Sequence, residues 1–183
     1  MSDDVKNLVE RAKSGDRSAA SQLITEFYER IFAYFRRRCG NDEDAADLTQ
    51  KTFCKVWTSL KNYDQRSSFN TWLHSIAHHV YVDWRRVNHR LDPQSDEWWD
   101  ACIADEPGPF ENAAEGEAAH QLYRAVEQLN DEQRDIVHLH YYQSLSIQET
   151  ADALSIATST VKYRLRNALT ALQGRLTEPK LHV

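Results

Sequence analysis

The stretch LSIQETADALSIATSTVKYRLRNALTA, residues 145–171, carries the clearest pattern of the chain. Ser146 and Glu149 stand three residues apart before an apolar run, which is the spacing of a capping box at the start of a helix. Apolar side chains then recur with helical spacing on one face, at Ile147, Ala151 and Leu154. After a break, a second helical pattern has its apolar positions at Val161, Leu165, Ala168, Leu169 and Leu172. Two helices joined by a tight turn predict a helix-turn-helix, whose second helix enters the DNA major groove.

A helical hairpin inside any all-α protein would show the same periodicity, so this alternative stays open at this point. Ser155 stands in the turn where Gly is common. Ala157 occupies the place of the usual Ser or Thr cap, so we expect Thr158 or Ser159 to cap the second helix. Three cations off the apolar stripe favour DNA binding, namely Lys162, Arg164 and Arg166.

The rest of the chain predicts an all-α protein. Its 183 residues suffice for one ordinary domain or two small ones. No convincing period-two strand appears, and three of the four prolines lie together between residues 93 and 109. The three cysteines are widely spaced and form no CxxC pair, which argues against a disulfide framework or a zinc site. We expect no membrane insertion and a cytoplasmic location, because no leader or long apolar run is found.

The distribution of charge predicts two domains. The net charge is −6, but residues 91–120 hold nine acidic side chains and no Lys or Arg, whereas residues 1–90 hold 15 basic and 12 acidic ones. We therefore expect two small helical domains, 1–90 and 118–183, joined by an acidic, flexible linker at 91–117. Trp98 and Trp99 are unusual in such a linker, because exposed paired tryptophans are unfavourable unless they dock on something. Attraction of the free chain to DNA should be weak, since DNA affinity is largely phosphate neutralisation.

The N-terminal half contains further helical patterns. Asp16 and Asp42 are candidate caps, and the polar stretch KNYDQRSS, residues 61–68, predicts a loop. The helix that follows carries aromatic and basic side chains off its apolar stripe, a composition that suits single-stranded nucleic acid. His74 and His78 have a metal-ligand spacing, but no carboxylate or Cys completes a set. No catalytic triad or nucleotide-binding loop appears, so we expect neither an enzyme nor a cofactor.

Taken together, the chain resembles the extracytoplasmic-function (ECF) sigma factors of the bacterial sigma-70 family. The resemblance rests on three stretches: DLTQKTFCKVW (47–57), SSFNTWLHSIAHHVYVDWRR (67–86) and LNDEQRDIVHLHYYQSLSIQETADALSIATSTVKYRLRNAL (129–169). It implies a factor that binds core RNA polymerase, recognises the −35 and −10 elements of a promoter and opens the duplex. It also implies core RNA polymerase and promoter DNA as partners, with an anti-sigma factor as a further candidate.

The resemblance places site residues on the matching positions. Those implied to bind core polymerase are Asp47, Leu48, Gln50, Phe53 and Trp57. Those implied to contact the −10 DNA, where a loop captures a flipped base, are Asn62, Arg66, Ser67, Phe69, Trp72, His78, His79, Asp83, Arg85 and Arg86. Those implied to contact the −35 DNA are Thr158, Ser159, Thr160, Lys162, Tyr163, Arg164 and Arg166.

Two positions depart from the family pattern. His79 stands where the family often has Asn, and Asn167 stands where it often has Arg. Two other classes of protein also remain open: a stand-alone DNA-binding regulator that uses only the C-terminal motif, and a helical binding module without a nucleic-acid partner. Co-purification with core RNA polymerase would separate both from the sigma factor.

Overall fold

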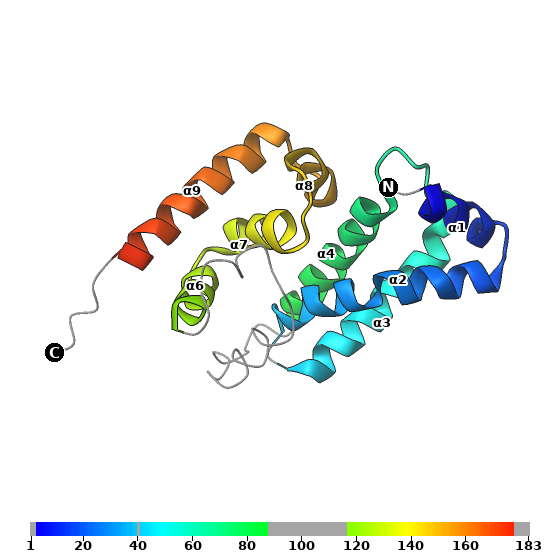
Figure 1. Cartoon of the computed structure of the whole chain (residues 1–183), viewed down its shortest axis with the longest axis horizontal. Helices are drawn as coiled ribbons and strands as arrows, with labels where there is room; N and C mark the ends of the chain where they lie inside the picture. Colours follow the sequence, from blue (N-terminus) through cyan, green and yellow to red (C-terminus); the bar gives the residue numbers. More distant parts are fainter. Residues whose placement is uncertain (1–2, 40, 88–116, 178–183) are drawn as a thin grey trace. The chain divides into compact units, whose positions relative to one another are not determined.

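The computed structural model describes residues 3–39, 41–87 and 117–177, and all regular structure in these ranges is helical (Figure 1). The predicted all-α class is therefore confirmed. The chain divides into two compact units, one that holds the helices before residue 88 and one that holds the helices from residue 117 onward. The predicted linker, with Trp98 and Trp99, lies outside the described residues apart from Glu117, so its boundaries stay a prediction.

The first unit is built from α1 (Asp3–Lys13), α2 (Arg17–Arg36), α3 (Asp42–Ser59), a short 3₁₀ turn (Leu60–Asn62) and α4 (Phe69–Val87). α2 packs against both α1 and α3, and α4 packs against α3. Phe27 of α2 and Phe69 of α4 meet edge to face with ring centroids 5.2 Å apart. The largest fully buried side chains of this unit are Val9, Ile31, Tyr34, Phe35, Leu48, Phe69, Leu73 and His74.

The helix starts of this unit follow the local sequence closely. Asp16 caps α2 as predicted, because its carboxylate accepts hydrogen bonds from the backbone N–H groups of Ser18 and Ala19. These bonds and the neighbouring Arg11 lower the pKa of Asp16. The predicted cap at Asp42 is wrong: Asn41 caps α3 by accepting from the N–H of Asp44, and Asp42 is the first helical residue. Asp42 still suits the helix dipole in the first turn.

The basic run at the end of α2 is part of the core. Arg37 and Arg38 are only 3% and 7% exposed. The guanidinium of Arg38 lies 4.0 Å from the ring centroid of Tyr81 on α4, a cation–π arrangement that suits a cation in an apolar setting. Next to it, burial raises the pKa of the Cys39 thiol to about 12, so this thiol is not in its reactive thiolate form at neutral pH.

The second unit consists of α6 (Glu117–Glu127), α7 (Asp131–Val137), a π-helical turn (His138–Tyr142), α8 (Ile147–Leu154) and α9 (Thr158–Thr177). α9 packs against α6 and α7. Asn130 caps α7, since its side-chain oxygen accepts from the N–H of Gln133. The π-helical turn was not predicted, because its residues keep an ordinary helical pattern in the sequence.

The helix-turn-helix is closed by local hydrogen bonds. The predicted capping box is confirmed: the N–H of Ser146 donates to Glu149, and the N–H of Glu149 donates to the Ser146 hydroxyl. At the other end of α8 the N–H groups of Ser155 and Ile156 bond to the carbonyls of Asp152 and Ala151. This pattern is a Schellman motif, and it holds Ser155 at a φ of 55° in the left-handed region.

The predicted cap of α9 by Thr158 or Ser159 is wrong. α9 begins at Thr158, so Ala157 takes the N-cap place, and its carbonyl accepts from the N–H groups of Thr160 and Val161. The Schellman motif ends α8 at Leu154, and α9 begins at Thr158, only four residues later. In the described part of the chain no helix is long and apolar enough to cross a membrane.

Candidate polymerase and DNA interface

The residues proposed to bind polymerase lie on α3. Asp47 and Gln50 are exposed, with an ion pair of 3.4 Å between Asp47 and Lys51 one turn further on. Both partners of this pair are more than half exposed, so it is screened by water and adds little to stability. The Asp47 carboxylate and the Gln50 amide are therefore available to a partner.

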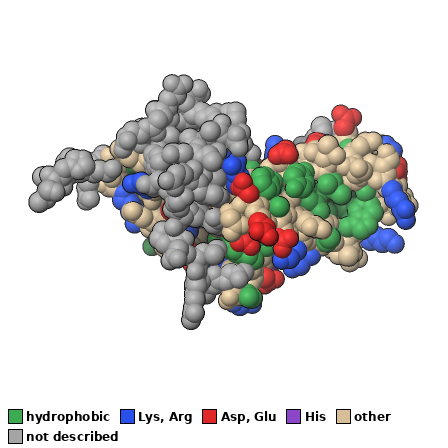
Figure 2. All heavy atoms as spheres, turned by 90° about the horizontal axis from the view of Figure 1, so that it is seen from below, with side chains coloured by type: hydrophobic (Ala, Val, Ile, Leu, Met, Phe, Trp, Pro, Cys, Tyr) green, Lys and Arg blue, Asp and Glu red, His purple; other side chains and the backbone are tan. Residues whose placement is uncertain are grey.

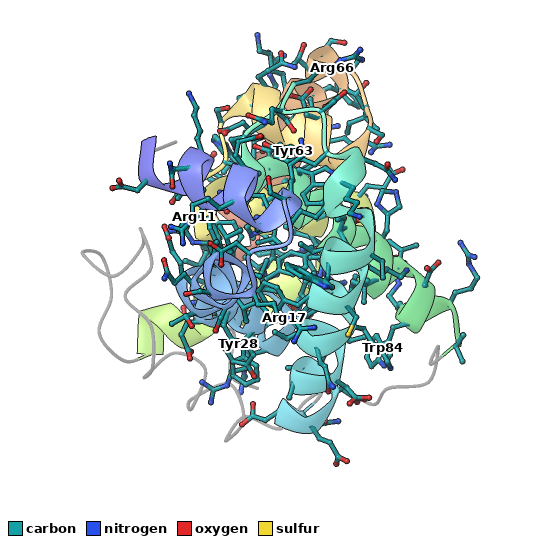
Figure 3. The ribbon with its side chains drawn as sticks, turned by 90° about the vertical axis from the view of Figure 1, so that its right-hand side faces the viewer. Arg11, Arg17, Tyr28, Tyr63, Arg66 and Trp84 are labelled. Carbon is teal, nitrogen blue, oxygen red and sulfur yellow. The ribbon has the colours of Figure 1, made fainter. Side chains whose placement is uncertain are left out.

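A groove runs beside this polar face. It has a volume of about 690 Å³ and lies between α3 and α4. Asp47, Gln50 and the exposed thiol Cys54 line it from α3, and Val80 and Trp84 line it from α4. Trp84 thus lies toward α3, as Figure 3 shows, and contributes an apolar wall next to the polar side chains of α3.

Apolar side chains continue this surface toward α2. Hydrophobic side chains gather on the face seen in Figure 2, with acidic ones beside them. Trp57 of α3 is 45% exposed, and Ile24 and Tyr28 of α2 are 40% and 37% exposed. The ring of Tyr28 is stacked on Phe53, which is 9% exposed, at a centroid distance of 6.4 Å.

Two residues of the set implied to bind polymerase are buried: Phe53 is 9% exposed, and Leu48 lies deeper in the core. Leu48 is 1% exposed, so it supports the surface from beneath. Phe69, assigned to the −10 set, is also 1% exposed and does the same for α4. Neither Leu48 nor Phe69 offers contact area in this conformation.

α4 presents a face that carries several of the proposed −10 residues and meets the groove at Asp83. Positions 72, 79, 83 and 86 follow helical spacing on one side of α4, where His79, Asp83 and Arg86 are exposed and Trp72 is half-buried. The Nδ1 atom of His79 lies 2.6 Å from the Ser75 carbonyl oxygen. A carbonyl can only accept, so Nδ1 carries the proton, and Nε2 is the atom left for a base edge.

His78 and Arg85 lie on the flank of this face. Both are half-buried, and the Arg85 guanidinium is 6.0 Å from the ring centroid of Tyr81. Asp83 is an acid on a surface proposed to meet DNA, but its carboxylate lies 3.6 Å from Lys55 and 4.0 Å from Arg86. These two cations offset its repulsion of phosphate.

The loop before α4 is more ordered than its polar sequence predicted. Tyr63 is only 2% exposed, and its hydroxyl donates to the Ser67 carbonyl at 2.6 Å. Its ring stacks on Trp72 with centroids 4.7 Å apart. Burial raises the pKa of Tyr63 to about 12, with the nearby Asp64 carboxylate adding to the effect. Sequence reasoning missed this residue, because one aromatic in a polar run shows no periodicity.

The other proposed residues of the loop face solvent. Asn62 and Arg66 are exposed and Ser67 is half-buried. Arg66 pairs with Asp64 at 3.1 Å, yet its side chain is 90% exposed. Figure 3 shows Arg66 at the outer edge of the unit and Tyr63 further in. The loop therefore has a buried tyrosine anchor and an exposed polar edge.

α9 divides into two opposite faces. Val161, Leu165, Ala168 and Leu172 form the buried stripe that the sequence predicted, whereas Leu169 of that predicted stripe is 42% exposed. The opposite face is exposed and polar or aromatic, at Ser159, Lys162, Tyr163, Arg166 and Thr170. Tyr163 is 65% exposed. Thr158 and Thr160 are half-buried beside this face.

Arg164 departs from the other proposed −35 residues. Its Nη2 atom donates to Glu132 of α7 at 2.6 Å, and its side chain is 25% exposed. The pair links two helices of the second unit. Arg164 thus helps to hold α9 in place, and the exposed cations near the start of α9 are Lys162 and Arg166.

These faces present side chains that can contact a macromolecule. The two units offer acceptors and donors for a protein surface, an aromatic and basic strip on α4, and a polar helix face on α9. Within the described ranges no group of three or more His, Cys, Asp or Glu side chains is placed to hold a metal ion. The arrangement suits binding and positioning of macromolecules.

Comparisons with known proteins match both units. Residues 23–91 match the model of sigma-70 region 2, and residues 119–172 match that of sigma-70 region 4. The ECF RNA polymerase sigma factor SigX of Bacillus subtilis is 30% identical over 158 residues, which cover 84% of this chain and 81% of SigX.

Two solved structures share the fold. CnrH, in complex with the cytosolic domain of CnrY, matches with a TM-score of 0.72 at 21% identity, over 95% of this chain and 97% of CnrH. The sigma factor RpoE of Bartonella quintana, in complex with the anti-sigma factor NepR, matches with a TM-score of 0.66 at 19% identity, over 87% of this chain and 98% of RpoE.

Proposed function

Since the chain belongs to the ECF sigma factors of the sigma-70 family, which act in transcription initiation, we propose that it binds core RNA polymerase, recognises −35 and −10 promoter elements and opens the duplex. The observation that carries this proposal is that α3 and α4 of the first unit present two adjoining surfaces of different chemistry. α3 bears an acid–amide pair beside the groove, and α4 bears a strip with Trp72, His79 and Arg86 that meets the groove at Asp83. One unit can then bind a protein and a DNA strand together.

The −10 region is recognised, on this proposal, by α4 and residues 62–68, which we call the 62–68 loop. Trp72 offers a ring for stacking, His79 offers Nε2 to a base edge, and Arg86 follows the phosphate backbone. Extruding a base costs a few kcal/mol of unstacking, which stacking and edge hydrogen bonds in a pocket recover. No covalent step is needed to open DNA in this way.

The function is tested by transcription from genomic fragments of the source organism with purified core RNA polymerase. We expect discrete transcripts that start at defined positions only when this protein is added. A helical binding module without a nucleic-acid partner would add no start sites, and that result would contradict the proposal.

Recognition of the −35 element is proposed for the exposed face of α9. If Arg166 bonds to a base edge, Arg166→Ala should cost about 1–3 kcal/mol of promoter affinity and relax specificity at one base pair. Lys162→Ala should weaken binding evenly across sequences, as loss of a phosphate contact does. The measurement is holoenzyme affinity for promoters with each −35 base pair replaced in turn.

The matched control for these variants is Arg17→Ala, which removes one exposed cation from α2 in the other unit. It should leave the holoenzyme's affinities for the promoters with replaced −35 base pairs unchanged. Footprints indifferent to both Arg166→Ala and Lys162→Ala would mean that the α9 face has no part in DNA recognition.

We also propose an anti-sigma protein as a partner, because the structural relative RpoE is in complex with the anti-sigma factor NepR. The exposed side chains of Ile24, Tyr28 and Trp57 give such a protein an apolar surface next to the proposed polymerase site. A partner bound there would compete with polymerase for the same unit.

A further inference from the structure

Two side chains of α1 reach the 62–68 loop across the first unit. The Nζ atom of Lys13 donates to the backbone carbonyl of Tyr63 at 3.0 Å. The Nε2 atom of Gln65 donates to the Glu10 carboxylate. Glu10 and Lys13 are three positions apart on α1, and their charged ends lie 3.7 Å from one another. A single ion pair on α1 thus bonds to two residues of the loop.

α1 is itself firmly seated. Val5, Val9 and Ala12 are 5%, 1% and 4% exposed, and α1 packs on α2, on α4 and on the 3₁₀ turn that leads into the loop. The side chain of Lys13 is only 23% exposed, so its bond to the Tyr63 carbonyl is partly shielded from water. The contacts to the loop therefore come from a fixed support.

The loop has a conformation that needs such support. Gln65 has a φ of 61°, in the left-handed region that non-glycine residues rarely adopt. Within the loop the Tyr63 hydroxyl donates to the Ser67 carbonyl, and both the backbone N–H and the side chain of Arg66 bond to the Asp64 carboxylate. The α1 contacts add to these at Tyr63 and at Gln65, on either side of Asp64.

We propose that α1 fixes the 62–68 loop in its base-capturing shape before DNA arrives, with Lys13 and Glu10 as positioning residues for −10 recognition. This inference rests on the proposed function of the loop. Holding the loop in advance lowers the ordering cost that base capture would otherwise have to meet. Neither Lys13 nor Glu10 has to touch DNA, and neither is among the site residues that the family resemblance implied.

The test uses the holoenzyme and two versions of one pre-opened promoter bubble. The promoter is one that the wild-type holoenzyme transcribes. The second version carries an abasic nucleotide in place of the non-template −10 base that is unstacked in the wild-type complex. The variants are Lys13→Met, which keeps the alkyl stem without the donor, and Glu10→Ala, which removes the acceptor. Their charge changes are opposite in sign.

We expect both variants to bind the intact bubble about tenfold more weakly, which is the loss that follows from removing one charge-assisted hydrogen bond. On the abasic bubble, where no base is captured, the difference from wild type should fall below about twofold. Lys13→Arg should restore binding, because its guanidinium can donate to the same carbonyl. Affinity for core polymerase should not change.

The control is Lys6→Met, which removes the same charge from an exposed position of α1. It should behave as wild type.

Charge effects alone would make Glu10→Ala bind DNA more tightly, so tighter binding would overturn the inference. Wild-type affinity in both variants, or an equal loss on both bubbles, would overturn it too. Failure of the wild-type holoenzyme to transcribe any promoter would instead contradict the proposed function. If Lys13→Met does not fold, Glu10→Ala decides by the same outcomes.

Discussion

The isolated protein is expected to show no specific promoter binding at physiological salt, whereas its complex with core RNA polymerase binds and opens the same promoter. Specific DNA-binding proteins reach dissociation constants of about 10⁻⁸ to 10⁻¹¹ M, and non-specific binding is typically about 10⁻⁴ to 10⁻⁶ M. We expect the dissociation constant of the free chain to lie in the non-specific range. Core polymerase should therefore raise the affinity for the promoter about a thousandfold or more.

The charges of the molecule are the reason for this expectation. The whole chain carries −6, and the exposed cations near the start of α9 are Lys162 and Arg166, because Arg164 is bonded to Glu132. Few phosphates can then be neutralised, and affinity from counterion release is small. On the proposed function, the strip on α4 contacts DNA only after the strands part, and parting them is costly without a scaffold that holds the product.

The measurement is a mobility shift and a permanganate footprint on one promoter, each with and without core polymerase. Permanganate reactivity of −10 thymines should appear only in the presence of both proteins. The control is core polymerase alone, which should leave the promoter closed. Nanomolar specific binding by the free protein would contradict this prediction and would support the alternative of a stand-alone DNA-binding regulator.

The second large effect is expected at α3. Asp47→Ala combined with Gln50→Ala should reduce affinity for core polymerase about thirtyfold or more, since truncating polar contacts at an interface centre costs about 2 kcal/mol or more. Both side chains are exposed and beside the groove that Trp84 lines, so a partner that fills the groove would desolvate them. The loss of the Asp47–Lys51 pair should not affect folding, because that pair is exposed.

The comparison variant is Gln22→Ala with Glu26→Ala, which removes one exposed amide and one exposed acid from α2. It should bind core polymerase as wild type does, and both double variants should melt at the wild-type temperature. Titration of labelled protein against core polymerase measures the affinities. Equal affinity of the α3 variant and the wild type would remove Asp47 and Gln50 from the interface.

Local patterns in the sequence determined the helices and much of their termini. The capping box of Ser146 and Glu149, the cap at Asp16 and the buried positions of α9 depend on residues a few places apart. Such contacts form in a helix whatever else surrounds it, so periodicity and capping rules find them. The errors at Asp42 and at the start of α9 were shifts of one or two residues, which is the usual uncertainty of helix ends.

Motifs in the sequence mark the candidate site residues, but they do not indicate the burial or the bonding partners of those residues. Asp47, Gln50, His79 and Arg166 are exposed, as contact residues must be. Leu48 and Phe69 lie instead in the core, and Arg164 is bonded to Glu132, 32 residues away. The periodicity of the sequence indicates which face of a helix a residue lies on, but it does not indicate what packs against that face.

The class of fold and the helix-turn-helix therefore followed from the sequence by itself, because both depend on short-range spacing. The shape of the 62–68 loop was decided only by the tertiary structure. Tyr63 is buried against Trp72, and its carbonyl is bonded to Lys13, 50 residues away. No periodic pattern encodes a contact of that separation, since it exists only after α1 and α4 have packed into one core.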